Sequence, residues 1–229
     1  MNRLLASTGL LISNSCLAAP TAPFSAWNKS GDEHEARFCV RLGTIDVSAD
    51  AGGQLQVAGR RAASLRLMKF ETIDWLWSMP AGSDYLIAYE STHRDEDSSS
   101  GGLCRFSGDL MRRRWCTQFP AFNLTASMSS SKTVFLAGIG TVAEVDARSG
   151  KYLWKVSGLY DRSQAFNSFF TGVERGRMVE FYAVDGGGNA KPWMALIDRT
   201  TGKLSSAKQV DSQTSEALDP PRSAGPCLK

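Results

Sequence analysis

The sequence contains a repeated turn motif, and this repeat constrains the fold more than any other feature. Residues 143–151 read Ala-Glu-Val-Asp-Ala-Arg-Ser-Gly-Lys, and residues 195–203 read Ala-Leu-Ile-Asp-Arg-Thr-Thr-Gly-Lys. In each copy a short apolar run ends at an aspartate, whose carboxylate can accept hydrogen bonds from the turn backbone. The glycine that follows supplies a positive φ, which lets the chain reverse into the next strand. The motif therefore predicts two similar antiparallel hairpins, 52 residues apart.

Weaker copies of the motif occur at residues 103–109 and 47–56. Several short segments are rich in β-branched and aromatic residues and are bounded by turn formers, which is the pattern of β-strands. These segments are residues 38–47, 85–89, 134–137, 143–145, 152–156, 179–184 and 193–197. Helical periodicity is scarce, and the best amphipathic candidate, residues 61–73, is ambiguous. The sequence therefore predicts an all-β domain.

The segment from Asp146 to Trp154, Asp-Ala-Arg-Ser-Gly-Lys-Tyr-Leu-Trp, resembles the hairpin of quinoprotein-type β-propeller repeats. In those repeats Asp-x-x-Thr-Gly-Lys precedes a tryptophan, and the copy that begins at Asp198 has Ser205-Ser206 instead of it. The resemblance implies a propeller-like architecture and no particular function, since many such propellers serve as scaffolds or binding surfaces without a quinone. Residues 37–210 leave room for about four units of roughly 40–50 residues. We expect a small or irregular β-propeller-like arrangement of antiparallel hairpin units, with a β-sandwich as the alternative.

Residues 1–19 have the pattern of a cleaved signal peptide. Arg3 supplies a positive charge, residues 4–12 are mostly apolar, and the small residues Ala18 and Ala19 follow. We therefore expect an exported, periplasmic protein. After the signal we expect three parts, which are a flexible lead-in over residues 20–36, a β domain over residues 37–210 and an extended tail over residues 211–229 that Cys227 pins.

Cys16 lies within the signal segment, where Ser13 and Asn14 depart from the pattern of a bacterial lipobox. We interpret Cys16 as part of the discarded signal, with lipid anchoring through Cys16 as the alternative.

Four further cysteines, Cys39, Cys104, Cys116 and Cys227, make an even number in an exported chain, which indicates disulfide bonds. Four cysteines allow three connectivities. Cys104 and Cys116 flank the turn-forming residues 107–109, which favours a bridge across one hairpin, and Cys39 and Cys227 would then join the two ends of the domain. A zinc site is disfavoured because no two cysteines have Cys-x-x-Cys spacing.

No catalytic motif is present in the sequence. The two histidines, His34 and His93, lie in polar segments, and the Gly-x-Ser-x-Gly motif of serine hydrolases is absent. We therefore expect a protein without enzymatic activity, cofactor or metal. The net charge of +3 is too small to indicate nucleic-acid binding. No segment after the signal is apolar over the roughly 20 residues that a membrane span needs.

Two charged segments are candidates for a partner-binding surface. One consists of Arg94, Asp95, Glu96 and Asp97 in a polar loop, and the other consists of Arg112, Arg113 and Arg114 beside Trp115. Polar loops on a rigid β scaffold commonly carry recognition, and an arginine beside an aromatic residue is typical of interface anchors. For both segments a solvated surface without a partner is the alternative.

Taken together, the signal, the cysteines and the missing catalytic groups predict a periplasmic protein that binds another protein. Small exported proteins of this kind resemble the immunity proteins that neutralise toxic effectors delivered between bacteria. The expected role is therefore the inhibition of a secreted toxin. The alternatives are an envelope-assembly scaffold of the propeller type and a degenerate quinoprotein-like enzyme.

Overall fold

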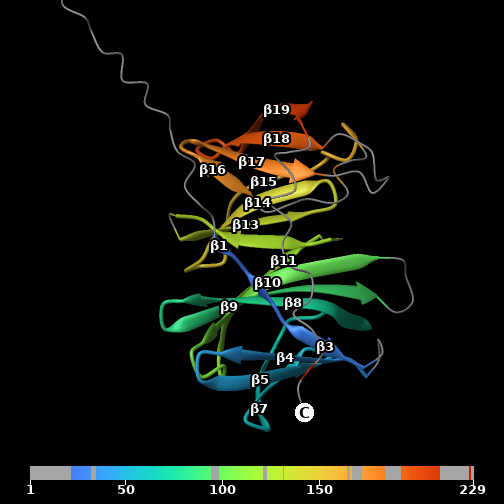
Figure 1. Ribbon diagram of the computed structural model, residues 1–229, viewed down its shortest axis with the longest axis vertical. Helices are drawn as coiled ribbons and strands as arrows, with labels where there is room; N and C mark the ends of the chain where they lie inside the picture. Colours follow the sequence, from blue (N-terminus) through green and yellow to red (C-terminus); the bar gives the residue numbers. More distant parts are fainter. Residues whose placement is uncertain are drawn as a thin grey trace, which may run out of the picture.

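The chain folds into four antiparallel β-sheets that stack face to face (Figure 1). The computed structural model describes residues 22–31, 35–93, 98–120, 123–130, 132–163, 166, 172–183, 192–211 and 227. Over these residues the secondary structure is β-strand and turn, with no α-helix. The prediction of an all-β fold is confirmed.

Each sheet is built on four strands that follow one another in the sequence, as in the blades of a propeller. Sheet 1 contains β3 (Asn28–Ser30), β4 (Arg37–Leu42), β5 (Ile45–Asp50), β6 (Gln54–Val57) and β7 (Arg60–Ser64). Sheet 2 contains β2 (Ser25–Ala26), β8 (Glu71–Ala81), β9 (Asp84–His93), β10 (Ser99–Ser107) and β11 (Arg113–Phe119). Sheet 3 contains β1 (Ala22–Pro23), β12 (Thr125–Met128), β13 (Thr133–Gly138), β14 (Thr141–Asp146) and β15 (Tyr152–Val156). Sheet 4 contains β16 (Val173–Arg175), β17 (Met178–Ala183), β18 (Trp193–Asp198) and β19 (Lys203–Gln209).

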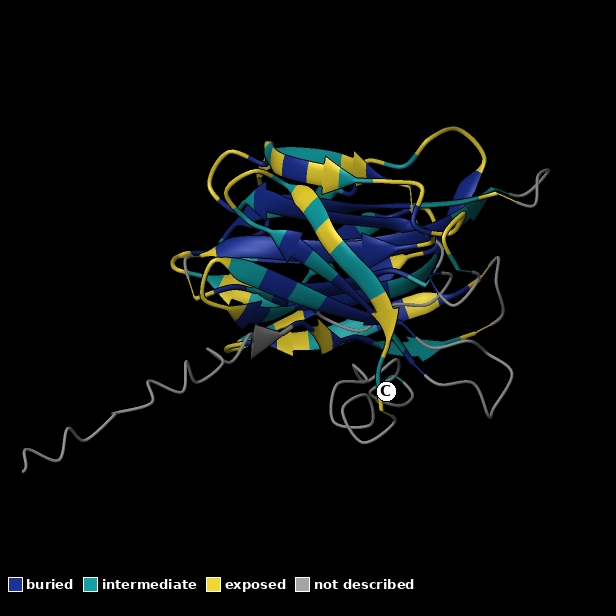
Figure 2. Cartoon of the chain, turned by 90° about the horizontal axis from the view of Figure 1, so that it is seen from above, coloured by how far each residue is buried: buried dark blue, intermediate teal, exposed yellow. Residues whose placement is uncertain are grey.

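Three apolar cores fill the spaces between successive sheets. In strand β9, Leu86 and Ala88 belong to the core shared with sheet 3, whereas Ile87 and Tyr89 belong to the core shared with sheet 1. Sheets 2 and 3 are therefore covered on both faces, and Figure 2 shows buried residues along the inner strands, with exposed residues at the turns and on some outer strands. No core contains residues of both sheet 1 and sheet 4, so the sheets form an open, propeller-like stack.

The N-terminal segment runs along the stack and adds one short strand to each of the first three sheets (Figure 1). Strand β1 pairs with β12, β2 pairs with β8, and β3 pairs with β4. Between these strands, Phe24 enters the core of sheets 2 and 3, and Trp27 enters the core of sheets 1 and 2. Both side chains are 2% exposed, and the Trp27 indole N–H donates to the Ser78 hydroxyl at 2.9 Å. The expectation of a flexible lead-in is wrong for the described residues of this segment, because its aromatic side chains are core residues.

The repeated motif joins one sheet to the next. Trp115 on β11 lies against Gly150 in the β14–β15 turn, where a Cβ atom would come within 2.5 Å of the indole ring. Trp154 on β15 lies in the same way against Gly202 in the β18–β19 turn. The position that corresponds to these tryptophans in the last copy is Ser206 on β19, and sheet 4 is the last sheet of the described chain.

Residues 61–73, the best helical candidate, contain the end of β7, an irregular connection and the start of β8. The helical interpretation is wrong for this segment. The connection is fixed by Tyr89, whose hydroxyl donates to the carbonyl oxygen of Arg66 at 2.5 Å. Burial raises the pKa of Tyr89 above its ordinary value, which keeps this hydroxyl protonated as a donor.

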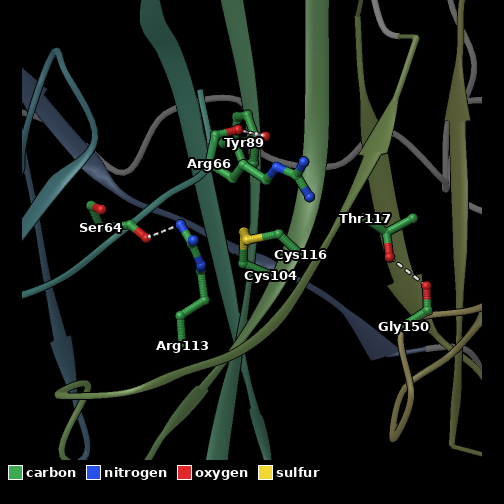
Figure 3. The surroundings of a disulfide bond; sticks show 8 residues. All are labelled: Ser64, Arg66, Tyr89, Cys104, Arg113, Cys116, Thr117 and Gly150. Atoms are coloured by element: carbon green, nitrogen blue, oxygen red, sulfur yellow. Dashed lines mark hydrogen bonds between the residues drawn. A yellow bond between two sulfur atoms is a disulfide. The ribbon is translucent and has the colours of Figure 1, made fainter. Parts of the chain in front are cut away.

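The structure contains the two expected disulfides. Cys39 on β4 bonds to Cys227, with the Cα atoms 5.8 Å apart, which attaches the C-terminal segment to sheet 1. Cys104 and Cys116 are directly opposite residues of β10 and β11, and their Cα atoms lie 4.1 Å apart (Figure 3). Apart from Asp211 and Cys227, the residues expected to form the tail lie outside the described residues.

Replacement of Trp27 by alanine tests the structural role of the N-terminal segment. The variant should lose about 3–5 kcal/mol of unfolding free energy, because a large cavity opens between sheets 1 and 2. Urea denaturation followed by circular dichroism measures this loss. Ser25→Ala, at an exposed position of the same segment, is the matched control and should change stability by less than about 0.5 kcal/mol. A loss below about 1 kcal/mol for Trp27→Ala would contradict the packed arrangement.

The two disulfides should contribute unequally to stability because they close loops of different length. Cys39 and Cys227 are 188 residues apart, and Cys104 and Cys116 are 12 residues apart. In the loop-entropy description, alanine at both positions of the long-range pair costs about 5 kcal/mol, and at both positions of the short-range pair about 3 kcal/mol. Denaturant unfolding of the two double variants measures the difference. A larger loss for the Cys104 and Cys116 variant would refute the loop-length explanation.

Candidate protein-binding site

The structure describes only one of the two segments that were predicted to bind a partner. Arg94, Asp95, Glu96 and Asp97 lie outside the described residues. The preceding residue, His93, is the last residue of β9 and pairs with Glu71 of β8, so it belongs to the sheet. The structure describes the second segment completely.

The basic segment 112–115 contacts three different sheets and does not form one cluster. Arg113 donates from Nη1 to the carbonyl oxygen of Ser64 in sheet 1 at 2.9 Å (Figure 3). Arg114 forms an ion pair within sheet 2, and the Trp115 indole N–H donates to a carbonyl oxygen in sheet 3. The side chain of Arg112 stays exposed at the turn. These contacts make the β10–β11 hairpin a connection between sheets.

A cleft opens between sheets 2 and 3, beside this hairpin. Its cavity volume is about 480 Å³, which lies within the range of about 300–1,000 Å³ that is typical of ligand pockets. Its walls come from the β8–β9 turn, from β10, and from the β12–β13 and β14–β15 turns of sheet 3. The lining residues are Pro80, Ala81, Gly82, Arg105, Met128, Lys132, Ala147 and Arg148.

Arg105 is the innermost cation of the cleft, and its guanidinium group is held on several sides. Its Nε donates to the Asp84 carboxylate at 2.8 Å, and its Nη1 donates to the carbonyl oxygen of Ala147 at 2.9 Å. Asp84 also lies 3.6 Å from Arg114, measured from Nε to Oδ2. The side chains of Asp84 and Arg105 are only 10% and 20% exposed. This partly buried group joins sheets 2 and 3 and fixes the floor of the cleft.

Lys132 and Arg148 are the exposed cations at the rim of the cleft. Neither forms a salt bridge with a carboxylate of the described residues. Three cations, Arg105, Lys132 and Arg148, therefore line the cleft, and among them Arg105 forms a salt bridge with a described carboxylate, that of Asp84. A concave surface with an excess of one charge concentrates its electric field, so the cleft attracts anions.

Hydrogen bonds hold the backbone at Arg148 in place, although the side chain of Arg148 is exposed. Its carbonyl oxygen accepts the Trp115 indole N–H at 2.9 Å. In the same turn the Gly150 N–H donates to the Asp146 carbonyl oxygen at 2.8 Å, and the Ser149 N–H donates to the Asp146 carboxylate at 2.6 Å. The hydrogen bond from the Ser149 hydroxyl, followed by that from its N–H, lowers the pKa of Asp146. Asp146 is therefore ionised and committed to its own turn at neutral pH.

A second polar group joins sheets 3 and 4. Arg199 of the β18–β19 turn forms ion pairs with Glu144 and Glu174, whose side chains are each 2% exposed. Glu144 also accepts the Trp154 indole N–H at 2.8 Å, and Glu174 accepts the Ser130 N–H at 2.8 Å. The hydrogen bond to Glu144 raises the pKa of Arg199, so the arginine stays charged. Both carboxylates are occupied by donors, and we interpret this group as a structural connection between the sheets.

Within the described ranges, no group of three or more histidine, cysteine, aspartate or glutamate residues is placed to hold a metal ion. No helix in that part of the chain is long and apolar enough to span a membrane. No model of a known protein family matches the chain, and no curated protein matches it.

Sequence reasoning missed the cleft because its residues are distant in the chain. Arg148 lies within the repeated turn motif, so its place in a turn was predictable, but nothing in the motif indicates a neighbouring sheet. Lys132 belongs to no motif, and Arg105 lies in the weaker copy at residues 103–109. Only the face-to-face stacking of sheets 2 and 3 brings these cations together.

Removal of the Ser149 hydroxyl tests the electrostatics of this turn. In Ser149→Ala, the pKa of Asp146 should rise toward its ordinary value of about 3.9, because the largest cause of the lowering is lost. A lowered carboxyl pKa stabilises the folded state above the unfolded-state pKa, and that stability is lost as the pH falls through the folded-state pKa. The variant should therefore lose less stability on acidification below about pH 4. Carboxyl ¹³C titration by NMR measures both values.

Asp198, at the corresponding position of the last repeat, is the internal control. Its pKa is lowered mainly by the hydrogen bond from the Arg177 side chain, so Ser149→Ala should leave it unchanged. An unchanged pKa of Asp146, or an equal change of both residues, would contradict the assigned cause.

Proposed function

We propose that this protein is an exported, non-enzymatic protein-binding module, and that it acts as an inhibitor of the immunity-protein kind, which neutralises a toxic secreted effector. The observation that carries the proposal is the cationic cleft between sheets 2 and 3, mounted on turns that hydrogen bonds and a disulfide hold in place. Inhibition by binding requires a rigid, charged surface and no catalytic group.

The rigidity of the frame supports this role. The cleft is flanked by the Trp115–Gly150 contact and by the Arg105–Asp84 ion pair, and Cys104–Cys116 closes the neighbouring hairpin. A preorganised surface loses little conformational entropy on binding, which favours tight complexes. The two disulfides suggest an oxidising, exported compartment, and the signal-like N-terminus favours a periplasm.

Charge complementarity determines the kind of partner. Arginine and lysine side chains are hydrogen-bond donors without acceptors, so the rim of the cleft requires an acidic surface opposite it. Opposite charges across an interface accelerate association and select the partner. We expect the target to present carboxylates to Lys132 and Arg148.

Co-purification with the product of the adjacent gene tests the proposal. The wild-type chain should capture this product, and Lys132→Glu combined with Arg148→Glu should weaken the complex at least tenfold, since both rim charges become repulsive. Arg60→Glu combined with Lys203→Glu changes the net charge equally at exposed strand ends outside the cleft and should bind like the wild type. Isothermal titration calorimetry measures the affinities.

Two results would count against this function. Absence of any complex with a toxin-like neighbouring product would remove the inhibitor role. Capture of membrane-assembly proteins instead would favour the envelope scaffold, which the propeller-like stack of sheets also suits.

A further inference from the structure

The walls of the cleft combine two kinds of surface. The side chains of Pro80, Ala81, Met128 and Ala147 are mainly apolar, and they come from both sheets 2 and 3. Lys132 of the β12–β13 turn and Arg148 of the β14–β15 turn line the same cleft. A ligand that fills it must therefore offer at least one small apolar group and separate negative charges.

We propose that the cleft binds an extended acidic segment of a protein, with two carboxylate side chains on either side of a small apolar residue. This inference rests on the proposed function, because it names the part of the partner that enters the cleft. The Arg148 guanidinium binds one carboxylate in a bidentate manner, which its planar donors favour. The Lys132 ammonium group binds the second carboxylate as a point charge.

The inner arginine sets the depth to which the segment enters. The Nε and Nη1 donors of Arg105 already bind Asp84 and the Ala147 carbonyl oxygen, and its Nη2 lies 3.5 Å from the Ala81 carbonyl oxygen. Its positive charge still attracts an anion, but three of its five N–H donors are directed at protein oxygen atoms. The rim cations are therefore the hydrogen-bonding partners of the ligand, and the apolar wall contacts the residue between the two carboxylates.

A peptide suits this cleft better than a nucleic acid does. Proteins that bind single-stranded nucleic acids stack the bases on aromatic side chains along a basic groove. Among the described residues that line the cleft none is aromatic, and apolar side chains occupy part of its wall. Carboxylates spaced along a polypeptide match two cations that are separated by apolar surface.

The structure supplies a reporter for binding at this place. The Trp115 indole N–H donates to the carbonyl oxygen of Arg148 at 2.9 Å, so a ligand on Arg148 changes the environment of this proton. The Trp154 indole N–H donates instead to Glu144, in the group that joins sheets 3 and 4. The indole ¹H–¹⁵N signals of these two tryptophans therefore distinguish the cleft from the rest of the molecule.

The experiment titrates the disulfide-bonded protein with a blocked five-residue peptide of alternating alanine and glutamate. We expect a saturable shift of the Trp115 indole signal with no shift of Trp154. The same peptide with glutamine in place of glutamate should bind at least tenfold more weakly, and higher salt should weaken binding of the acidic peptide. Arg148→Glu and Lys132→Glu should each weaken it at least tenfold, whereas the Arg60→Glu and Lys203→Glu double variant should bind like the wild type.

Three outcomes would overturn the inference. These are no saturable shift up to millimolar peptide, equal binding of the glutamine peptide, and tighter binding of succinate or of a single-stranded oligonucleotide than of the acidic peptide. The inference and the proposed function can fail separately. Peptide binding without capture of a protein partner would remove the function and keep the site, whereas equal capture of the partner by Arg148→Glu would remove the site and keep the function.

Discussion

The burial of sheets 2 and 3 on both faces is the constraint on which the rest of the structure depends. A sheet without a solvent face is stable only when both neighbouring layers are present, because its apolar area is divided between two cores. Successive residues of β9, such as Leu86 and Ile87, point into different cores. The N-terminal segment belongs to the same arrangement, since Phe24 and Trp27 fill two successive interfaces. The apolar cores therefore lie between the sheets, and each core contains residues of two neighbouring sheets.

The sequence predicted the local features of this fold well, but it did not predict how the sheets stack on one another. The hairpins at Asp146 and Asp198 follow from their turn residues, and the Cys104–Cys116 bond follows from a turn between two cysteines. The longest strand, β8 (Glu71–Ala81), escaped prediction because its first residues belong to the segment 61–73, which was interpreted as the best candidate for an amphipathic helix. Phe24 and Trp27 escaped because the prolines, the glycine and the charged residues around them are typical of a flexible segment. The two side chains become core residues where the chain crosses the edges of successive sheets.

The candidate site shows the same limit. Arg112 to Trp115 are adjacent in sequence, and a basic cluster was the natural interpretation, but three of the four side chains contact different sheets. The cations of the cleft come from residues 105, 132 and 148, which no local pattern connects. The sequence of a short segment gives its net charge. The face of the molecule on which each charged side chain lies depends on the pairing of distant strands.

The absence of a tryptophan from the last repeat changes what sheet 4 can pack against. Trp115 and Trp154 each cover a turn glycine of the following sheet, and Ser206 occupies the corresponding position in sheet 4, the last sheet of the described residues. A small polar residue leaves this edge of sheet 4 without the bulky side chain through which sheets 2 and 3 each cover the next turn. A further hairpin unit joined at this edge would pack in the same way only if an indole were restored at this position.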